Sequence, residues 1–276
     1  MRTSGVRERT SASRTVLAGL TALALAALPG CGGGPSTRGG ADGAEVTGAV
    51  TVFAAASLTE SFTRIGKDFE AAHPGVRVTF NFAGSAALAA QINQGAPADV
   101  FASAAPANMQ TVVDAGNAAE SPTVFARNQL VIAVAKGNPT GVTGLADLLG
   151  RNDRTGQRLK VALCAEQVPC GAAARRALDT AGVAVQPVTL EQDVRAALAK
   201  VKLGEVDAAL VYRTDVHAAA ADVDGVEFPE SAKAINEYPI VTLKDAPNPA
   251  AARAFVAYVR SDAGARVLTD AGFQTP

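Results

Sequence analysis

The sequence predicts an α/β fold built on parallel sheets, and three observations support this. Segments typical of β-strands alternate with segments typical of helices from about residue 50 onward. Hydrophobic residues make up 48% of the chain and charged residues 18%, which is enough apolar material for a packed core. The length of 276 residues suggests two compact units, at ~150 residues for each domain.

The first part of the chain shows this alternation in short units. An apolar strand is predicted at 50–54, and Ser57 with Glu60 forms a Ser-x-x-Glu pattern typical of a helix start. The helix continues with apolar residues at helical spacing and ends before Pro74 and Gly75. The next predicted elements are a strand at 76–82, a helix at 86–92 and a strand at 99–103.

The second part begins with a nearly continuous apolar run at 129–135, typical of a strand buried on both faces. No long internal repeat is visible. The remaining predicted elements are strands at 160–164, 206–212 and 238–243, and helices at 144–149, 171–181, 192–201 and 249–260.

The first thirty residues form a predicted secretory signal. An arginine-rich start precedes an apolar run at 16–28, which is too short to cross a bilayer of ~30 Å. The sequence Leu28-Pro-Gly-Cys31 resembles a bacterial lipobox, which implies cleavage before Cys31, a lipid on its sulfur and attachment to the membrane from outside the cytoplasm. A plain signal with a coincidental cysteine is the alternative. The glycine-rich segment 31–47 is predicted to be a flexible tether.

Two further cysteines, Cys164 and Cys170, stand close together in the chain. Outside the membrane such a pair usually forms a disulfide. Metal binding is less favoured because no other cysteine and neither histidine lies nearby in the sequence.

Composition and missing motifs exclude several functions. The net charge of −1, the absence of Trp and an aromatic content of 5% argue against nucleic-acid binding. The two histidines give little support to a histidine-based hydrolase, and no Gly-x-Ser-x-Gly or phosphate-binding Gly-x-x-x-x-Gly-Lys motif occurs. The chain therefore shows no ATP-binding motif of its own.

Several short motifs occur together and in order: Phe53-Ala-Ala-Ala-Ser57-Leu, Phe82-Ala-Gly-Ser85-Ala-Ala-Leu, Gly95-Ala-Pro-Ala-Asp99, Val168-Pro-Cys-Gly171, Asp193-Val-Arg, Val211-Tyr212 and Ala271-Gly-Phe273. Over about residues 50–273 this combination resembles the molybdate-binding proteins of bacterial ABC importers. The resemblance implies a two-lobed, type II periplasmic-binding-protein-like fold that holds an oxyanion in the cleft between its lobes. We assign lobe 1 to 48–126 plus 238–276 and lobe 2 to 127–237.

The resemblance also implies the ligand contacts and the partners. Hydroxyl donors fall on Ser57, Ser85 and Tyr212, and backbone amide donors on Ala104, Cys170 and Val194. Many relatives have alanine where this chain has Cys170, which leaves the amide donor in place but lets a disulfide restrain its turn. The expected partners are molybdate or tungstate and the permease and ATPase subunits of an importer, with no cofactor, and the protein is expected to be a monomer.

The residues agree with an anion site independently of the resemblance. Ser57, Ser85, Cys170 and Val194 lie where helices are predicted to begin, and helix starts present free N–H groups to anions. A pocket of donors only disfavours phosphate, whose own proton would lack an acceptor. Closure of the lobes is expected about two crossing segments, near Arg127 and Asn236.

Two alternative functions remain open. The first is a receptor for another ion: sulfate would suit the same donors, whereas ferric iron usually needs clustered tyrosines and carboxylates. The second is a secreted enzyme on the same scaffold, which is disfavoured because the predicted pocket contains no acid, base or metal ligand.

Overall fold

The computed structural model describes residues 46–152 and 155–276, so the predicted signal peptide, Cys31 and nearly all of the tether lie outside the described residues. The described part contains two five-stranded sheets, as the α/β prediction requires. No helix within it has both the length and the apolar character needed to cross a membrane.

The first sheet is mixed, and the portion built on it is called lobe 1 below. Strands β1, β2 and β3 are mutually parallel, whereas β10 runs antiparallel to both of its neighbours, β3 and β4. The order across the sheet is β2 (Val76–Ala83), β1 (Gly48–Ala55), β3 (Val100–Ala102), β10 (Asn236–Thr242) and β4 (Thr123–Asn128).

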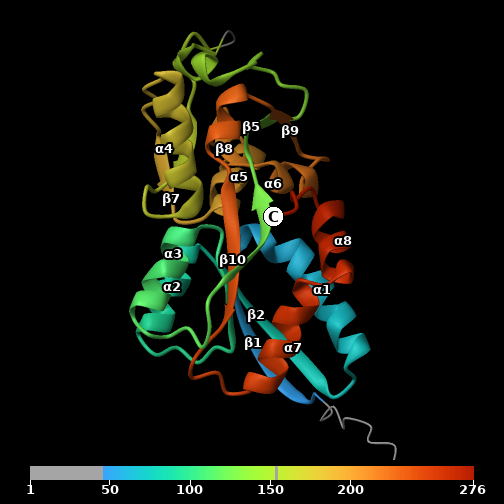
Figure 1. The fold of residues 1–276 in the computed structure, drawn as a ribbon. Helices are drawn as coiled ribbons and strands as arrows, with labels where there is room; N and C mark the ends of the chain where they lie inside the picture. Colours follow the sequence, from blue (N-terminus) through green and yellow to red (C-terminus); the bar gives the residue numbers. More distant parts are fainter. Residues whose placement is uncertain (1–45, 153–154) are drawn as a thin grey trace, which may run out of the picture. The chain divides into compact units, whose positions relative to one another are not determined.

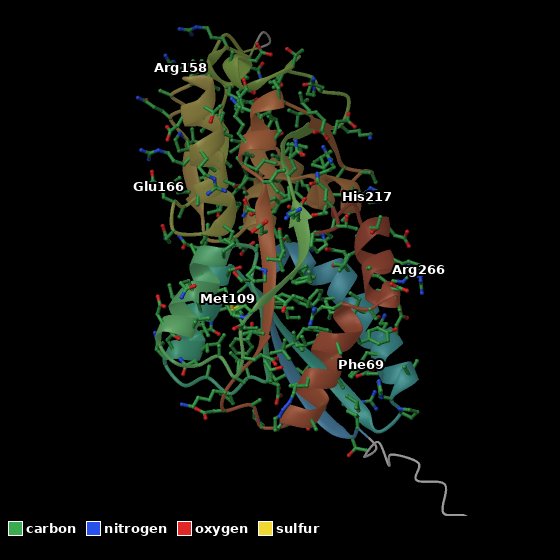
Figure 2. All side chains as sticks on the ribbon, in the orientation of Figure 1. Phe69, Met109, Arg158, Glu166, His217 and Arg266 are labelled. Carbon is green, nitrogen blue, oxygen red and sulfur yellow. A yellow bond between two sulfur atoms is a disulfide. The ribbon has the colours of Figure 1, made fainter. Side chains whose placement is uncertain are left out.

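Helices cover both faces of the lobe 1 sheet (Figure 1). On one face lie α1 (Thr59–Ala72), α7 (Pro249–Val259) and α8 (Asp262–Asp270), and on the other lie α2 (Ser85–Asn93) and α3 (Pro106–Asp114). Each face has its own apolar cluster: Phe69 belongs to the first and Met109 to the second, and both side chains are labelled in Figure 2. The sheet is therefore buried between two helical layers.

The second sheet has the same plan and forms lobe 2. Strands β6, β7 and β8 are parallel, and β5 is antiparallel to β8 and β9. The order is β7 (Thr189–Glu191), β6 (Val161–Cys164), β8 (Ala208–Tyr212), β5 (Leu130–Ala135) and β9 (Val223–Val226). The helices of this lobe are α4 (Pro169–Ala181), α5 (Val194–Lys202), α6 (Arg213–Ala218) and the short 3-10 helices η2 (Leu145–Leu149) and η3 (Pro229–Lys233).

The chain passes between the sheets in two places. It crosses at Gln129, between β4 and β5, and returns between β9 and β10 (Figure 1). Strands β4 and β10 pair with each other, and each runs across the lobe limits that we predicted from the sequence. These limits remain a prediction, but the crossings lie close to Arg127 and Asn236, where the hinge was expected.

The predicted capping role of Ser57 is wrong. Residues Ala56–Leu58 form a 3-10 turn, η1, and α1 begins at Thr59 with Leu58 as its N-cap and no side-chain capping bond. The Ser57 hydroxyl is instead hydrogen-bonded to Tyr238. The Ser-x-x-Glu pattern correctly indicated a helix start, but a tertiary partner competes for the serine oxygen.

Candidate ligand-binding site

The six predicted site residues follow six different parallel strands, three in each lobe. The carboxyl ends of parallel strands form one edge of a sheet, the usual place for ligands in open α/β folds. In lobe 1, Ser57, Ser85 and Ala104 follow β1, β2 and β3, and in lobe 2, Cys170 and Val194 follow β6 and β7 and Tyr212 ends β8.

These six residues meet in one small pocket between the lobes. All are buried, and all line a narrow space of about 10 Å³. A cavity needs roughly 10–15 Å³ to hold one water, whereas pockets for drug-sized ligands measure about 300–1,000 Å³, so only a small ligand suits this site. Its other lining residues are Ala55, Ala56, Gly84, Val168, Pro169 and Asp193.

The two serines differ in their partners. The Ser85 hydroxyl oxygen accepts a hydrogen bond from the Ala104 backbone N–H at 3.0 Å. The Ser57 hydroxyl lies 2.9 Å from the Tyr238 hydroxyl. The Ala104 amide, which was expected to contact the ligand directly, is therefore hydrogen-bonded to Ser85 in this structure. The Ser85 proton is not used in this bond and can point to another acceptor.

Backbone amides of lobe 2 come from two helix starts. Cys170 is the second residue of α4, after Pro169, and Val194 is the first residue of α5. At these positions an N–H group has no partner within its own helix and carries part of the positive end of the helix dipole. Both helix starts therefore supply uncharged donors to the pocket.

The turn that carries Cys170 is tightly restrained. The Cys164 and Cys170 sulfur atoms are bonded, which joins the end of β6 to the first turn of α4. A Cβ at Gly171 would overlap the Ala165 carbonyl oxygen, so the close packing of this turn requires glycine. The position of the Cys170 amide is thus fixed on both sides.

Asp193 is an acidic wall residue that the sequence analysis did not assign to the pocket. It is the N-cap of α5, and its carboxylate accepts the Ala196 N–H at 3.0 Å. This bond leaves the Val194 amide free for a ligand. No lysine or arginine is among the residues that line the pocket.

Burial keeps the tyrosine hydroxyls of the site protonated. Desolvation raises the pKa of Tyr212 well above its ordinary value, and that of Tyr238 is raised for the same reason. Behind them, desolvation also raises the pKa of Asp215 to about 7, although its carboxylate accepts the Tyr212 N–H at 2.9 Å. The phenols are therefore hydrogen-bond donors throughout the physiological range.

The lobes touch each other beside the pocket. A Cβ at Gly84 in lobe 1 would overlap the Gln192 carbonyl oxygen in lobe 2. On the outside, Glu60 of α1 forms an ion pair with Arg195 of α5. A small ion in the pocket would be enclosed by both lobes.

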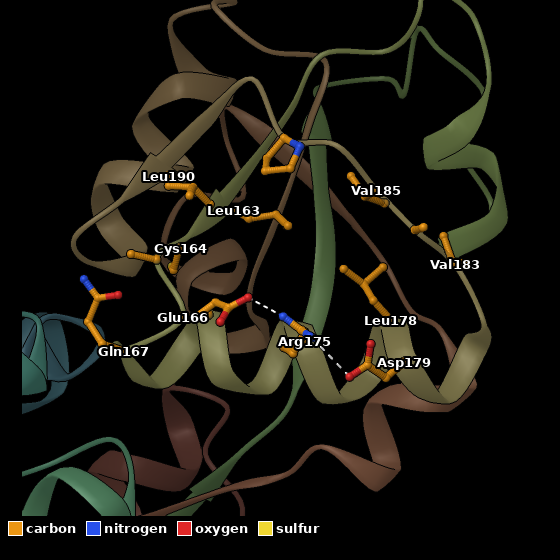
Figure 3. Close-up of a pocket in the computed structure, with 14 residues that line it drawn as sticks. Leu163, Cys164, Glu166, Gln167, Arg175, Leu178, Asp179, Val183, Val185 and Leu190 are labelled. Carbon is orange, nitrogen blue, oxygen red and sulfur yellow. Dashed lines mark hydrogen bonds and ion pairs between the residues drawn. The ribbon is translucent and has the colours of Figure 1, made fainter.

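A larger hollow beside α4, with a volume of about 620 Å³, is a poor anion site. Its walls are mainly apolar, and the Arg175 guanidinium is paired with both Glu166 and Asp179 (Figure 3). Because two carboxylates already surround this cation, an added dianion would be repelled. Metal binding also lacks support: within residues 46–152 and 155–276, no group of three or more His, Cys, Asp or Glu side chains could hold an ion.

Three polar residues behind the pocket escaped the sequence analysis. Asn128, Asn236 and Tyr238 are buried. Asn236 donates to the Tyr212 hydroxyl, Tyr238 is hydrogen-bonded to Ser57, and Asn128 donates to Tyr238. The indication in the sequence is their position, since both asparagines stand at the expected crossing segments near Arg127 and Asn236. A single sequence does not show that β4 and β10 bring them together.

Comparison with known families identifies the chain. A family model described as bacterial extracellular solute-binding protein matches residues 50–274. The chain belongs to this family. This confirms the resemblance drawn from the sequence motifs at the level of an extracellular solute-binding protein.

Individual relatives agree with the assignment. This solute-binding protein is 45% identical over 257 residues to a Mycobacterium tuberculosis chain named molybdate-binding protein ModA, covering 93% of this chain and 96% of that one. A Bacillus subtilis chain, named as a candidate ABC transporter substrate-binding lipoprotein, YvgL, is 32% identical over the same shares. A solved Azotobacter vinelandii periplasmic molybdate-binding protein has a TM-score of 0.68 at 21% identity, covering 82% of this chain and 99% of that one, and supports the fold.

Proposed function

We propose that this solute-binding protein captures molybdate or tungstate outside the cytoplasm and delivers it to the permease of an ABC importer. The observation that carries the proposal is the convergence of six parallel strand ends on one small, buried pocket. The relative from Mycobacterium tuberculosis, similar over nearly its whole length, is named for molybdate binding.

The donor set of the pocket suits a tetrahedral dianion. Ser57, Ser85 and Tyr212 supply hydroxyl protons, and Cys170 and Val194 supply amides at helix starts. Uncharged donors fixed in a dry cleft need little rearrangement when the ion binds. Ala104 contributes by holding the Ser85 oxygen, so that the serine proton can face the ion.

We also propose that the protein transports and does not catalyse. The one ionisable group on the pocket wall besides the tyrosine and the disulfide cysteine is Asp193, and its carboxylate is engaged in capping α5. General acid–base chemistry would need a free group of this kind within reach of the ligand. The ligand is therefore released unchanged to the permease and its ATPase partner.

Cys31 is proposed as the lipid anchor of a monomeric receptor at the membrane surface. The lipobox-like sequence before it supports this, as does the name of the Bacillus subtilis relative. In bacteria that produce the full chain, labelled fatty acid should be incorporated and the protein should stay in the membrane fraction. The Cys31→Ala variant should do neither, and equal labelling of the variant would reject the anchor.

The ligand assignment is tested by calorimetry on the chain that begins at residue 31. Molybdate, tungstate, sulfate and phosphate are titrated separately at neutral pH. We expect tight binding of molybdate and tungstate, weaker binding of sulfate and no heat from phosphate. Sulfate binding without molybdate binding would favour a sulfate receptor, and phosphate binding alone would overturn the donor-only pocket.

A further inference from the structure

Two buried asparagines face each other where the chain crosses between the lobes. Asn128 ends β4 and Asn236 begins β10, and the two residues are partners in the antiparallel ladder. Both side chains are buried, and neither lines the small pocket directly. Asn236 lies one hydrogen bond behind the Tyr212 hydroxyl, and Asn128 lies two behind the Ser57 hydroxyl, through Tyr238.

The orientation of the Asn236 amide is fixed by its neighbours. Its Nδ2 donates to the Ala104 carbonyl at 2.7 Å and to the Tyr212 hydroxyl at 2.8 Å. On the opposite side the Arg176 guanidinium donates to its Oδ1 at 3.4 Å. A carbonyl can only accept and a guanidinium can only donate, so the amide cannot be turned around. The Tyr212 oxygen is therefore an acceptor here, and its own proton points away from Asn236.

Asn128 is fixed in the same way. Its Oδ1 accepts the Gln129 backbone N–H at 2.9 Å, so its Nδ2 must face the Thr214 hydroxyl at 2.8 Å and the Tyr238 hydroxyl at 3.4 Å. Tyr238 in turn is 2.9 Å from Ser57. Either hydroxyl can donate in this contact. When Tyr238, whose oxygen accepts from the Asn128 amide, donates its own proton to Ser57, the Ser57 proton is left for the pocket.

The Ser57 and Tyr238 hydroxyls are hydrogen-bonded to each other, and the Tyr212 ring packs edge-on against the Tyr238 ring with centroids 6.1 Å apart, so the three side chains form one cluster. Amide donors enter this cluster at both ends. Among the hydrogen bonds found in the described residues, no carbonyl or carboxylate oxygen accepts a proton from any of the three hydroxyls. The Ser57–Tyr238 bond uses one of the two protons of that pair, so the other must point out of the pair toward the ligand. The Tyr212 proton, which points away from Asn236, is the second proton that can do so.

We propose that Asn128 and Asn236 are positioning residues that turn the hydroxyls of the site into donors, and that they thereby exclude oxyanions carrying a proton of their own. The inference rests on the proposed function and deepens it. Hydrogen phosphate and hydrogen arsenate each bear a hydroxyl that needs an acceptor. Because the Asn236 amide already occupies the Tyr212 oxygen, that phenol is not available to accept this proton, whereas fully ionised molybdate, tungstate and sulfate need donors only. The one carboxylate on the pocket wall, Asp193, is engaged in capping α5 through the Ala196 N–H.

The first test is a double-mutant cycle with molybdate as the probe. Asn236→Ala and Tyr212→Phe should each weaken binding about tenfold, and the double variant should be no more than about twofold weaker than Tyr212→Phe alone. Such coupling shows that the asparagine acts through the phenol. Losses that multiply would assign Asn236 a structural role and overturn the proposal. Asn117→Ala is the matched control, because its amide bonds only Asn93 on the exposed surface, and it should bind as the wild type does.

The second test reverses the proton order. Asn236→Asp replaces the donor by an acceptor, which claims the Tyr212 proton and turns the phenol oxygen toward the pocket. The added negative charge weakens the binding of every anion. The measured quantity is therefore the ratio of the dissociation constants for arsenate and molybdate. We expect the dissociation constant of arsenate divided by that of molybdate to fall at least tenfold, because the variant offers hydrogen arsenate the acceptor that the wild type withholds; tenfold is about the effect of one hydrogen bond. An unchanged ratio would contradict the proposal.

A measurement without ligand separates this inference from the proposed function. If the wild-type chain binds none of molybdate, tungstate and sulfate, the proposed function is rejected. The proton order is then decided by NMR of the free protein. The side-chain amide resonances of Asn236 should shift in Tyr212→Phe, and those of Asn128 should shift in Tyr238→Phe. Unmoved resonances in both variants would overturn the inference even if the wild-type chain binds a ligand.

Discussion

Gly84 in lobe 1 packs so closely against the Gln192 carbonyl in lobe 2 that any side chain at position 84 would overlap it. Gly84 has an ordinary extended backbone with φ −60° and ψ 134°, so glycine is required here by the neighbouring lobe and not by its own conformation. The contact joins the N-cap of α2 to the residue preceding the N-cap of α5. Both helices begin at the pocket.

We expect Gly84→Ala to weaken oxyanion binding at least tenfold, because the added methyl group holds the lobes apart at the pocket. The stability of the unliganded protein should change by less than about 1 kcal/mol, since the lobes can separate to accept the methyl. Calorimetry and thermal melting measure the two effects.

Gly144→Ala is the matched control for this substitution. A Cβ at Gly144 meets no atom within 4 Å, so this variant should bind with wild-type affinity. Arg195→Ala removes the exposed ion pair with Glu60 but keeps the backbone amide. It should reduce the free energy of oxyanion binding by no more than about 1 kcal/mol. Equal affinities for Gly84→Ala and Gly144→Ala would show that the lobes do not need this contact to hold the ion.

Ser57→Ala and Ser85→Ala should each weaken molybdate binding by ~1–3 kcal/mol, since each removes a hydroxyl donor from a buried site. Ser61→Ala serves as the control, because its buried hydroxyl bonds only to the Leu58 carbonyl within the same turn. Titration of the three variants under identical conditions gives the comparison. Wild-type affinity in the double variant Ser57→Ala/Ser85→Ala would remove both serines from the site.

Asp215 should make the stability of the protein depend on pH. Its pKa rises from 3.8 to about 7, chiefly through burial, so the folded state binds a proton in this range that the unfolded state does not. The contribution of Asp215 to the free energy of unfolding should therefore be greatest at and below about pH 4, should fall as the pH rises from 4 to 7 and should stay constant above that.

The variant Asp215→Asn tests this origin. The amide oxygen can still accept the Tyr212 N–H, but the side chain no longer titrates. Melting temperatures measured between pH 4.5 and pH 8.5 should fall less steeply for the variant than for the wild type. Parallel curves for the two proteins would assign the pH dependence to other groups.

The disulfide should contribute about 2 kcal/mol to stability, because it closes only a short loop. Cys164→Ser/Cys170→Ser is expected to melt at a lower temperature and to bind molybdate more weakly, since the Cys170 amide lies on the pocket wall. Mass measurement of the unreduced wild type checks the bond itself. Two free thiols in that measurement would show that the disulfide is not formed. Unchanged molybdate affinity in the double variant would show that the disulfide does not position the Cys170 amide.

Sequence patterns predicted the fold well where strands were long and apolar. The segment 129–135 contains β5, and the start of the predicted helix at 171–181 lies inside α4. Short elements were missed, such as β7 with three residues and β9 with four. Three or four residues are too few to show a clear hydrophobic periodicity. Helices α3 and α8 were missed as well, although α8 has a Ser261 cap that the sequence displays.

The candidate site could be predicted only in part. Residues that follow strands directly, such as Ser57 and Ser85, are recognisable because helix starts and short motifs mark them. The engagement of Ala104 by Ser85, and the supporting pair Asn128 and Asn236, depend on which strands become neighbours. For the asparagines, the deciding feature is the tertiary pairing of β4 with β10, which no local sequence pattern reveals.

The account depends on uncharged donors from both lobes holding one doubly charged tetrahedron. A crystal structure grown with molybdate, with the metal located by its anomalous scattering, tests this most directly. The account predicts a single strong peak ringed by the hydroxyls of Ser57, Ser85 and Tyr212 and the amides of Cys170 and Val194. A peak beside lysine or arginine side chains elsewhere, with the small pocket holding no metal, would contradict it.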